Sequence, residues 1–152
     1  MITESERLSG LFSDLYDGHP WLEITLHETL HNVTAQQAGK RPLPNCNTIW
    51  EITVHLIRWR QNVLRRVQGE VIKTPGHNYI EPVQDTSETA WNAVLEELET
   101  TQQHWLEFLR QFKTEDFDKE YPVNGITYYE HIQGIIQHDA YHMGQIVLLA
   151  KQ

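Results

Sequence analysis

Apolar residues recur every three or four positions along most of this 152-residue chain, which is the spacing that puts them on one face of an α-helix. Four long helices account for the pattern, and the first of them is kinked where Gly18-His19-Pro20 interrupts it. The predicted ranges are 4–17 and about 21–37 for the two parts of the first helix, then about 48–69, about 86–113 and 127–152.

Side chains at the helix starts and the composition of the connections support these boundaries. Thr48 and Glu51, like Thr127 and Glu130, have the spacing of a capping box, in which each residue bonds the backbone of the other. The connections, which contain proline and glycine, cover 39–45, 70–85 and 114–126. No segment alternates apolar and polar residues as a half-buried strand would. We therefore predict an all-α four-helix bundle in a single domain over residues 1–152, with a long loop between the second and third helices.

The composition argues against several classes of function. A net charge of −9, without a stripe of lysine and arginine, lacks the electrostatic footprint of a nucleic-acid-binding protein. The single cysteine, Cys46, allows neither an intramolecular disulfide nor a cysteine-rich zinc site. No run of about 18 apolar residues is present, and the N-terminal segment lacks the basic and apolar regions of a signal peptide. We expect a cytoplasmic protein without nucleic-acid or membrane partners.

Three histidines lie on the apolar faces of two predicted helices. His138 and His142 are four residues apart on the last helix, so their Cβ atoms are about 5–6 Å apart and both imidazoles can reach one metal ion. His55 lies on the apolar face of the helix that begins at Thr48. Facing helices of a bundle can bring such side chains together in the interior.

A buried polar layer would explain the same residues. An imidazole buried without a partner is costly, so each would need a hydrogen bond. Gln145, Gln102 or water could bond the pair on the last helix, and a backbone carbonyl or Glu51 could bond His55. The spacing alone leaves the metal site and the polar layer open.

A three-histidine site would have a defined chemistry. Three imidazoles leave at least one coordination position open, which is typical of catalytic and not of structural metal sites. A metal there would lower the pKa of bound water to about 7, or hold a thiol as its thiolate. Imidazole suits zinc, nickel, copper and iron, so the ligand type does not select the metal.

The two histidine segments resemble the motifs of the DinB/YfiT-like superfamily of metal-binding four-helix bundles. Members carry one ligand histidine on the second helix and an H-x-x-x-H pair on the fourth, commonly followed by G-Q. Residues 47–59 are similar to the second-helix motif and residues 138–146 to the fourth-helix motif, and the resemblance extends over nearly the whole chain. It implies three metal ligands: His55, His138 and His142. The chain departs from the pattern at Met143, where many members have arginine.

The resemblance also implies a function. Characterised members include metal-dependent thiol S-transferases and related enzymes. It implies a divalent transition metal, zinc or nickel first with manganese or iron as alternatives, and a homodimer. We expect a transferase-like or hydrolase-like activity in which a metal-activated thiolate or water attacks a small molecule, with a low-molecular-weight thiol as the partner in the first case. The alternative is a non-catalytic, stress-related bundle that binds a metal or ligand. No catalytic residue is assigned.

A second pattern, His27-Glu28-Thr29-Leu30-His31, matches the H-E-x-x-H signature of zinc peptidases. Peptidases with this signature normally add a sheet and a third ligand, and the sequence predicts neither. We therefore interpret His27 and His31 as candidates for lining the pocket from the first helix. The last helix supplies the other pocket candidates: His131, Tyr141 and Gln145.

Overall fold

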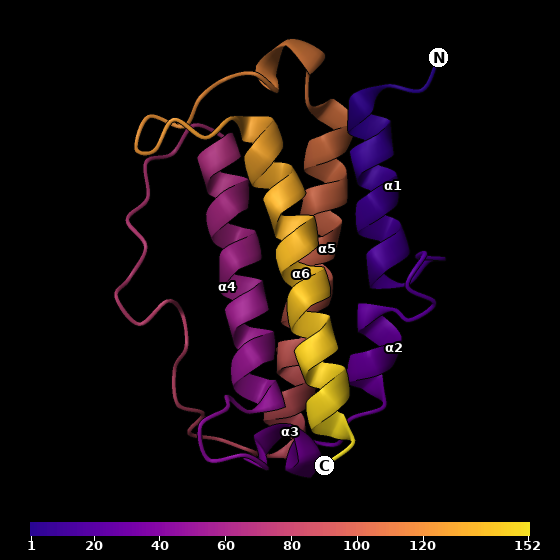
Figure 1. Ribbon diagram of the computed structural model, residues 1–152, viewed down its shortest axis with the longest axis vertical. Coiled ribbons are helices and arrows are strands. Elements are labelled where there is room, and N and C mark those ends of the chain that lie inside the picture. The colour runs from indigo at the N-terminus through magenta and orange to yellow at the C-terminus, as the bar shows by residue number, and fades with distance from the viewer.

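Four long helices pack side by side and run along the longest axis of the protein (Figure 1). The structure is a computed structural model and describes residues 1–152. The long helices are α1 (Glu4–Tyr16), α4 (Ile49–Val67), α5 (Glu88–Gln111) and α6 (Tyr128–Ala150), and a short 3₁₀ helix, η1 (Thr114–Asp116), follows α5. There is no β-strand, and no helix combines the length and the apolar composition needed to cross a bilayer. The predicted all-α four-helix bundle is confirmed.

The helices that carry the three histidines begin at the predicted caps. The N–H of Glu51 donates to Thr48 Oγ1 over 3.1 Å, and the N–H of Thr48 donates to Glu51 Oε2 over 2.8 Å. Thr127 and Glu130 form the same reciprocal pair at the start of α6. These bonds satisfy backbone donors that the first turn of a helix leaves without partners, so they fix where α4 and α6 start.

The prediction of one helix over residues 21–37 is wrong. The segment forms two short helices, α2 (Leu26–His31) and α3 (Ala35–Gly39). Each has its own cap, because Thr25 and Thr34 accept backbone N–H groups at the two helix starts. Leu22, which a continuous helix would bury, is 46% exposed in the turn before α2. Side chains that bond the local backbone therefore divide this segment despite its apolar periodicity.

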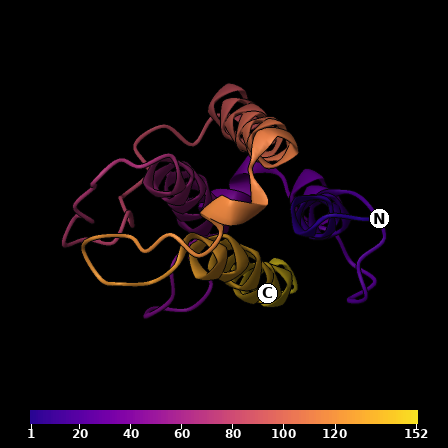
Figure 2. The same cartoon turned by 90° about the horizontal axis from the view of Figure 1, so that it is seen from above.

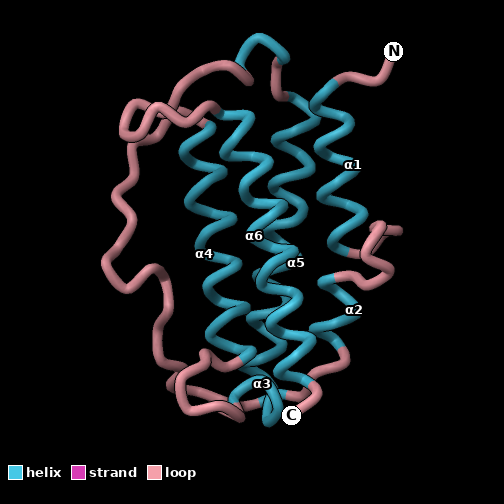
Figure 3. Tube along the Cα trace, in the orientation of Figure 1, coloured by secondary structure: helices cyan, strands magenta, loops and turns pink.

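The segment between α4 and α5 is a crossover that runs beside α4. Because α4 and α5 point in the same direction, the chain returns along the whole length of the bundle between them (Figure 3). α1 and α6 point in the opposite direction, and the view from above shows the four long helices around one interior (Figure 2). The predicted long loop between the second and third long helices is therefore confirmed, and it lies against the outer side of α4.

A layer of buried polar groups divides the core into two apolar clusters. Arg60 on α4 donates from Nε to Asp139 Oδ2 on α6 over 2.7 Å, and both side chains are only 1% exposed. The remaining guanidinium nitrogens donate to Thr101 and Gln102 on α5. Gln102 in turn donates to the backbone carbonyl of Phe12 on α1. One hydrogen-bonded network therefore joins all four long helices.

Candidate metal centre

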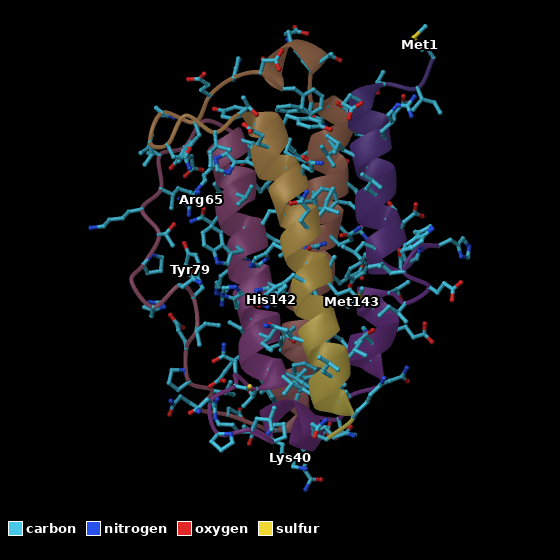
Figure 4. The ribbon with its side chains drawn as sticks, viewed as in Figure 1. Met1, Lys40, Arg65, Tyr79, His142 and Met143 are labelled. Atoms are coloured by element: carbon cyan, nitrogen blue, oxygen red, sulfur yellow. The ribbon has the colours of Figure 1, made fainter.

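Three histidine side chains from α4 and α6 meet in the structure. His55 on α4, and His138 and His142 on α6, each offer one ring nitrogen, and the three nitrogens lie within 4.8 Å of one another. His55 Nε2 and His138 Nε2 are 3.0 Å apart. His142 lies on the α4 side of α6, whereas Met143 lies on the other side (Figure 4) and is buried in the core. The packing of the two helices brings together residues that are 83 positions apart in the chain.

The loop beside α4 orients His55. Its Nδ1 donates to the backbone carbonyl of Asn78 over 2.7 Å; because a carbonyl oxygen only accepts, the imidazole proton is on Nδ1 and the lone pair is on Nε2. Asn78 Oδ1 accepts from Trp59 Nε1 over 3.1 Å, and the Tyr79 hydroxyl accepts from Asn62 over 2.7 Å. Asn78 and Tyr79 have φ of 52° and 58°, a left-handed conformation that is unfavourable for tyrosine. The hydrogen bonds from Trp59 and Asn62 on α4 hold the loop in this conformation.

Gln145 orients His142. Its Oε1 accepts from His142 Nδ1 over 2.7 Å, and its amide nitrogen donates to the Tyr141 hydroxyl over 3.0 Å. With the amide in this orientation, His142 carries its proton on Nδ1 and its lone pair on Nε2. Two of the three histidines therefore have the same tautomer, each fixed by a hydrogen bond from outside the cluster.

His138 connects the cluster to the buried polar layer. Its Nδ1 lies 3.6 Å from Asp139 Oδ1, and both atoms are buried without a hydrogen-bond partner. A proton on Nδ1 faces the carboxylate favourably, but the Nε2 lone pair then faces that of His55. A proton on Nε2 can be donated to the lone pair of His55 Nε2, but the Nδ1 lone pair of His138 then faces the carboxylate. Without a cation, each tautomer leaves one repulsive contact.

A divalent metal ion fits the residues present because it removes this conflict. With the proton on Nδ1 of all three histidines, the Nε2 lone pairs of His55 and His138 would both be available to a metal, and His138 Nδ1 would face Asp139. In many metal sites a carboxylate near the other ring nitrogen of a ligand histidine sets its tautomer, and Asp139 is placed near His138 Nδ1 in this way. A Zn–N bond is about 2.0–2.1 Å long, so two nitrogens 3.0 Å apart can share one ion. His55, His138 and His142 would hold it.

The three histidines line a cavity of about 550 Å³ beside α4, α6 and the crossover loop. His138 is 24% exposed, so the cluster is accessible from this space. Trp59, Ile80 and Ile135 give the cavity an apolar wall, while the histidines provide polar groups. This volume and mixture of side chains are typical of sites for small molecules.

The other predicted pocket residues fall in three places. His131 and Tyr141 line the cavity, and Gln145 bonds one of the histidines. His27 and His31 do not line it, so this part of the prediction is wrong. Their rings stack with centroids 3.8 Å apart in a separate hollow against α5. The reason is that α2 lies beside α6 on the side away from α4 (Figure 1).

Three contributors to the site were not predicted as such. The apolar pattern puts Trp59 in the buried stripe of its helix, yet its ring lies in the cavity, 6.1 Å from the His138 ring. Asp139, which follows His138 on α6, is buried in the contact with Arg60 on α4. Asn78 acts through its backbone carbonyl, which no side-chain pattern identifies. The one sequence signal was a carboxylate directly after His138.

The metal-free protein will lose stability as the pH falls from about 6.5 towards 4. Burial lowers the pKa of His55 to about 4 and also lowers the pKa of His142. The unfolded chain takes up these protons near pH 6.5, so protonation favours unfolding below that pH. Urea denaturation between pH 7 and pH 5 measures the effect. In His55→Gln the free energy of unfolding should fall less between pH 7 and pH 5 than in the wild type. An equal fall in the two proteins would mean that protonation of His55 does not cause the loss of stability.

Replacing Gln145 by alanine will weaken metal binding about 10–100-fold, because the His142 ring loses the partner that fixes its tautomer. Competition with a chelator of known affinity measures the change. Gln133→Ala is the matched control, since Gln133 is exposed on the same helix. Equal affinities in the two variants would mean that Gln145 does not support the site.

The match to a known family covers most of the chain. The model of the DinB superfamily matches residues 23–146, which include all three histidines. A solved structure described as a crystal structure of the conserved protein of locus from Enterococcus faecalis has a TM-score of 0.70 and 15% sequence identity, over 99% of this chain and 97% of that chain, which is a likeness of fold. No curated protein matches the chain. The chain belongs to the DinB superfamily.

Proposed function

We propose that this protein is a metal-dependent transferase that joins a low-molecular-weight thiol to a small electrophilic molecule. The observation that carries the proposal is the meeting of three ring nitrogens at an accessible cavity, with no fourth protein ligand in the group. Structural metal sites are usually closed by four protein ligands, whereas catalytic sites keep a position for a reactant. The homology to the DinB superfamily supports a metal at this position.

The side chains around the cavity would bind and orient the reactants. The three histidines would hold the metal, which, when bound, supplies the positive charge that keeps a thiol in its reactive thiolate form. Trp59 and Ile80 offer an apolar wall for the electrophile. The Tyr141 hydroxyl accepts a hydrogen bond from Gln145, so its own proton is free to donate to a leaving group.

The transfer forms one bond and breaks one bond. The thiol sulfur bonds to the electrophilic carbon while the bond from that carbon to a halide, or to an epoxide oxygen, breaks. The leaving group takes the electron pair. A halide leaves as the anion and the thiol proton passes to solvent, whereas an epoxide oxygen takes the Tyr141 proton, which the thiol proton then replaces through solvent. No oxidant or reductant is needed.

Turnover of a halo-aromatic or an epoxide with a panel of thiols tests the proposal. We expect at least one thiol to give a rate that requires the metal and that falls to background in His138→Ala. His104→Ala, at an exposed histidine on α5, should keep the rate. The absence of a metal-dependent rate with every thiol would refute the transferase. Metal-dependent cleavage of esters or amides without a thiol would replace it with a hydrolase, in which water is the nucleophile.

A further inference from the structure

A buried cation lines the same cavity as the three histidines. Arg66 lies on the His55 face of α4, three turns further along, which is about 16 Å at 1.5 Å per residue. Its side chain is only 7% exposed. The guanidinium carbon lies 5.4 Å from the centre of the Trp59 ring and 5.1 Å from that of Tyr121. The guanidinium therefore lies in cation–π distance of both rings.

No carboxylate forms an ion pair with Arg66. Its Nη2 donates to Thr74 Oγ1 over 2.8 Å, and its Nε is buried without a partner. Buried charges in proteins are usually paired, and the other buried arginine of α4, Arg60, is paired with Asp139. Glu130 lines the same cavity, but its carboxylate caps the start of α6. The positive charge of Arg66 is therefore left without a protein counter-ion.

His131 provides a second unsatisfied group in the same place. It is 8% exposed, and its Nε2 is buried without a partner. Its ring packs edge-on against Tyr121, 5.3 Å away, which is also the ring under Arg66. Burial, with the nearby charge of Arg66, lowers the pKa of His131, so the ring is neutral and can donate through one N–H. Arg66 and His131 therefore offer an anion hydrogen-bond donors that no protein acceptor uses.

We propose that Arg66 and His131 form an anion-binding subsite for a carboxylate or phosphate carried by the thiol substrate. The inference rests on the proposed transferase and narrows its thiol partner to acidic thiols. Trp59 spans the gap, since its ring centre is 6.1 Å from the His138 ring and 5.4 Å from the guanidinium carbon of Arg66. An apolar linker lying along the indole would place the sulfur at the histidines and the anion at Arg66. Two anchors on one molecule increase its affinity beyond that of either alone.

Thiol binding to the cobalt-loaded protein tests the subsite, because a cobalt–thiolate contact gives a charge-transfer absorption band. The probes are ω-mercaptocarboxylates of increasing chain length, with ω-mercaptophosphonates and ω-mercaptoalcohols of equal length. We expect the best acidic thiol to bind at least about tenfold more tightly than its alcohol, as a charge-assisted bond would give. The tighter of the two acids identifies the anion as carboxylate-like or phosphate-like.

In Arg66→Met the preference for the acidic thiol over the alcohol of equal length should fall to less than about twofold. The Kd of the alcohol should stay unchanged, because methionine keeps the apolar part of the arginine side chain in place. The matched control is Arg65→Met, since the neighbouring Arg65 is exposed and paired with Glu70. Arg65→Met should keep the full preference. Equal binding of acidic and neutral thiols by the wild type, or an unchanged preference in Arg66→Met, would overturn the proposal.

A second variant and a second binding measurement cover the cases in which Arg66→Met does not fold or no thiol binds. If Arg66→Met fails to fold, Arg66→Lys takes its place: it keeps the charge but loses the planar fork, and the preference should fall at least about threefold. If no thiol produces the absorption band, the proposed thiol transferase is refuted. Anion binding at Arg66 and His131 is then tested separately on the metal-free protein. Alkanedioates or inorganic phosphate should then raise the Tm of the wild type and of Arg65→Met but not that of Arg66→Met. No rise in the wild type would overturn the subsite as well.

Discussion

Replacing Asp139 by alanine will lower the free energy of unfolding of the metal-free protein by about 3–5 kcal/mol. The substitution leaves the Arg60 guanidinium at the centre of the bundle without its counter-ion, where both side chains are 1% exposed. Thr101 and Gln102 still accept hydrogen bonds from Arg60 but carry no charge to balance it. Denaturation in urea measures the loss, which is large compared with the 5–15 kcal/mol that typically stabilises a domain.

Two further variants separate the effect of the unpaired buried charge from the loss of a carboxylate as such. Asp118→Ala removes an exposed carboxylate and should change the stability by less than about 0.5 kcal/mol. The double variant Arg60→Met/Asp139→Leu removes both buried charges, and it should recover most of the stability lost in Asp139→Ala. If Asp139→Ala costs less than about 1 kcal/mol, or if the double variant is no more stable than Asp139→Ala, the buried pair does not organise the core as described.

Removing the metal with a chelator will lower the stability of the protein by about 4 kcal/mol, for a free metal concentration a thousandfold above the Kd. In the folded protein α4 and α6 bring His55 and His138 together, so that both would bind the ion. The unfolded chain separates them, so the binding free energy adds to the folding free energy. Thermal or urea denaturation with and without metal measures the shift.

The double variant His55→Ala/His142→Ala controls for metal bound elsewhere, because the chain has nine histidines. In this variant the addition of metal should leave the stability unchanged. A shift as large as that of the wild type would mean that the stabilising ion binds outside the three-histidine group.

The parts of the fold that could be predicted from sequence depend on neighbours along the chain. α4 and α6 start at their caps because Thr48 and Thr127 bond backbone groups only three residues away. The four-residue spacing of His138 and His142 likewise sets their common face by helix geometry alone. Local rules also explain the error at residues 21–37, where Thr34 and Gln37 form a capping box that the apolar periodicity concealed.

The parts that could not be predicted depend on distant contacts. Arg60 and Asp139 are 79 residues apart, and neither their pairing nor their burial has a sequence signature. His55 is oriented by the backbone carbonyl of Asn78, a group that every residue has and whose position depends on the course of the crossover loop. Arg66 is similar, since its lack of a counter-ion is visible only once the neighbours of the buried guanidinium are known.

The metal content of the protein without a polyhistidine tag tests the three-histidine centre most directly. Mass spectrometry after incubation with zinc, nickel, manganese and iron salts should find close to one ion per chain in the wild type and in His104→Ala. The same treatment of His142→Ala should leave it nearly free of metal, because one of three converging ligands is gone. No metal in the wild type, or equal metal in His142→Ala, would contradict the account and make the three histidines part of a polar layer in the bundle.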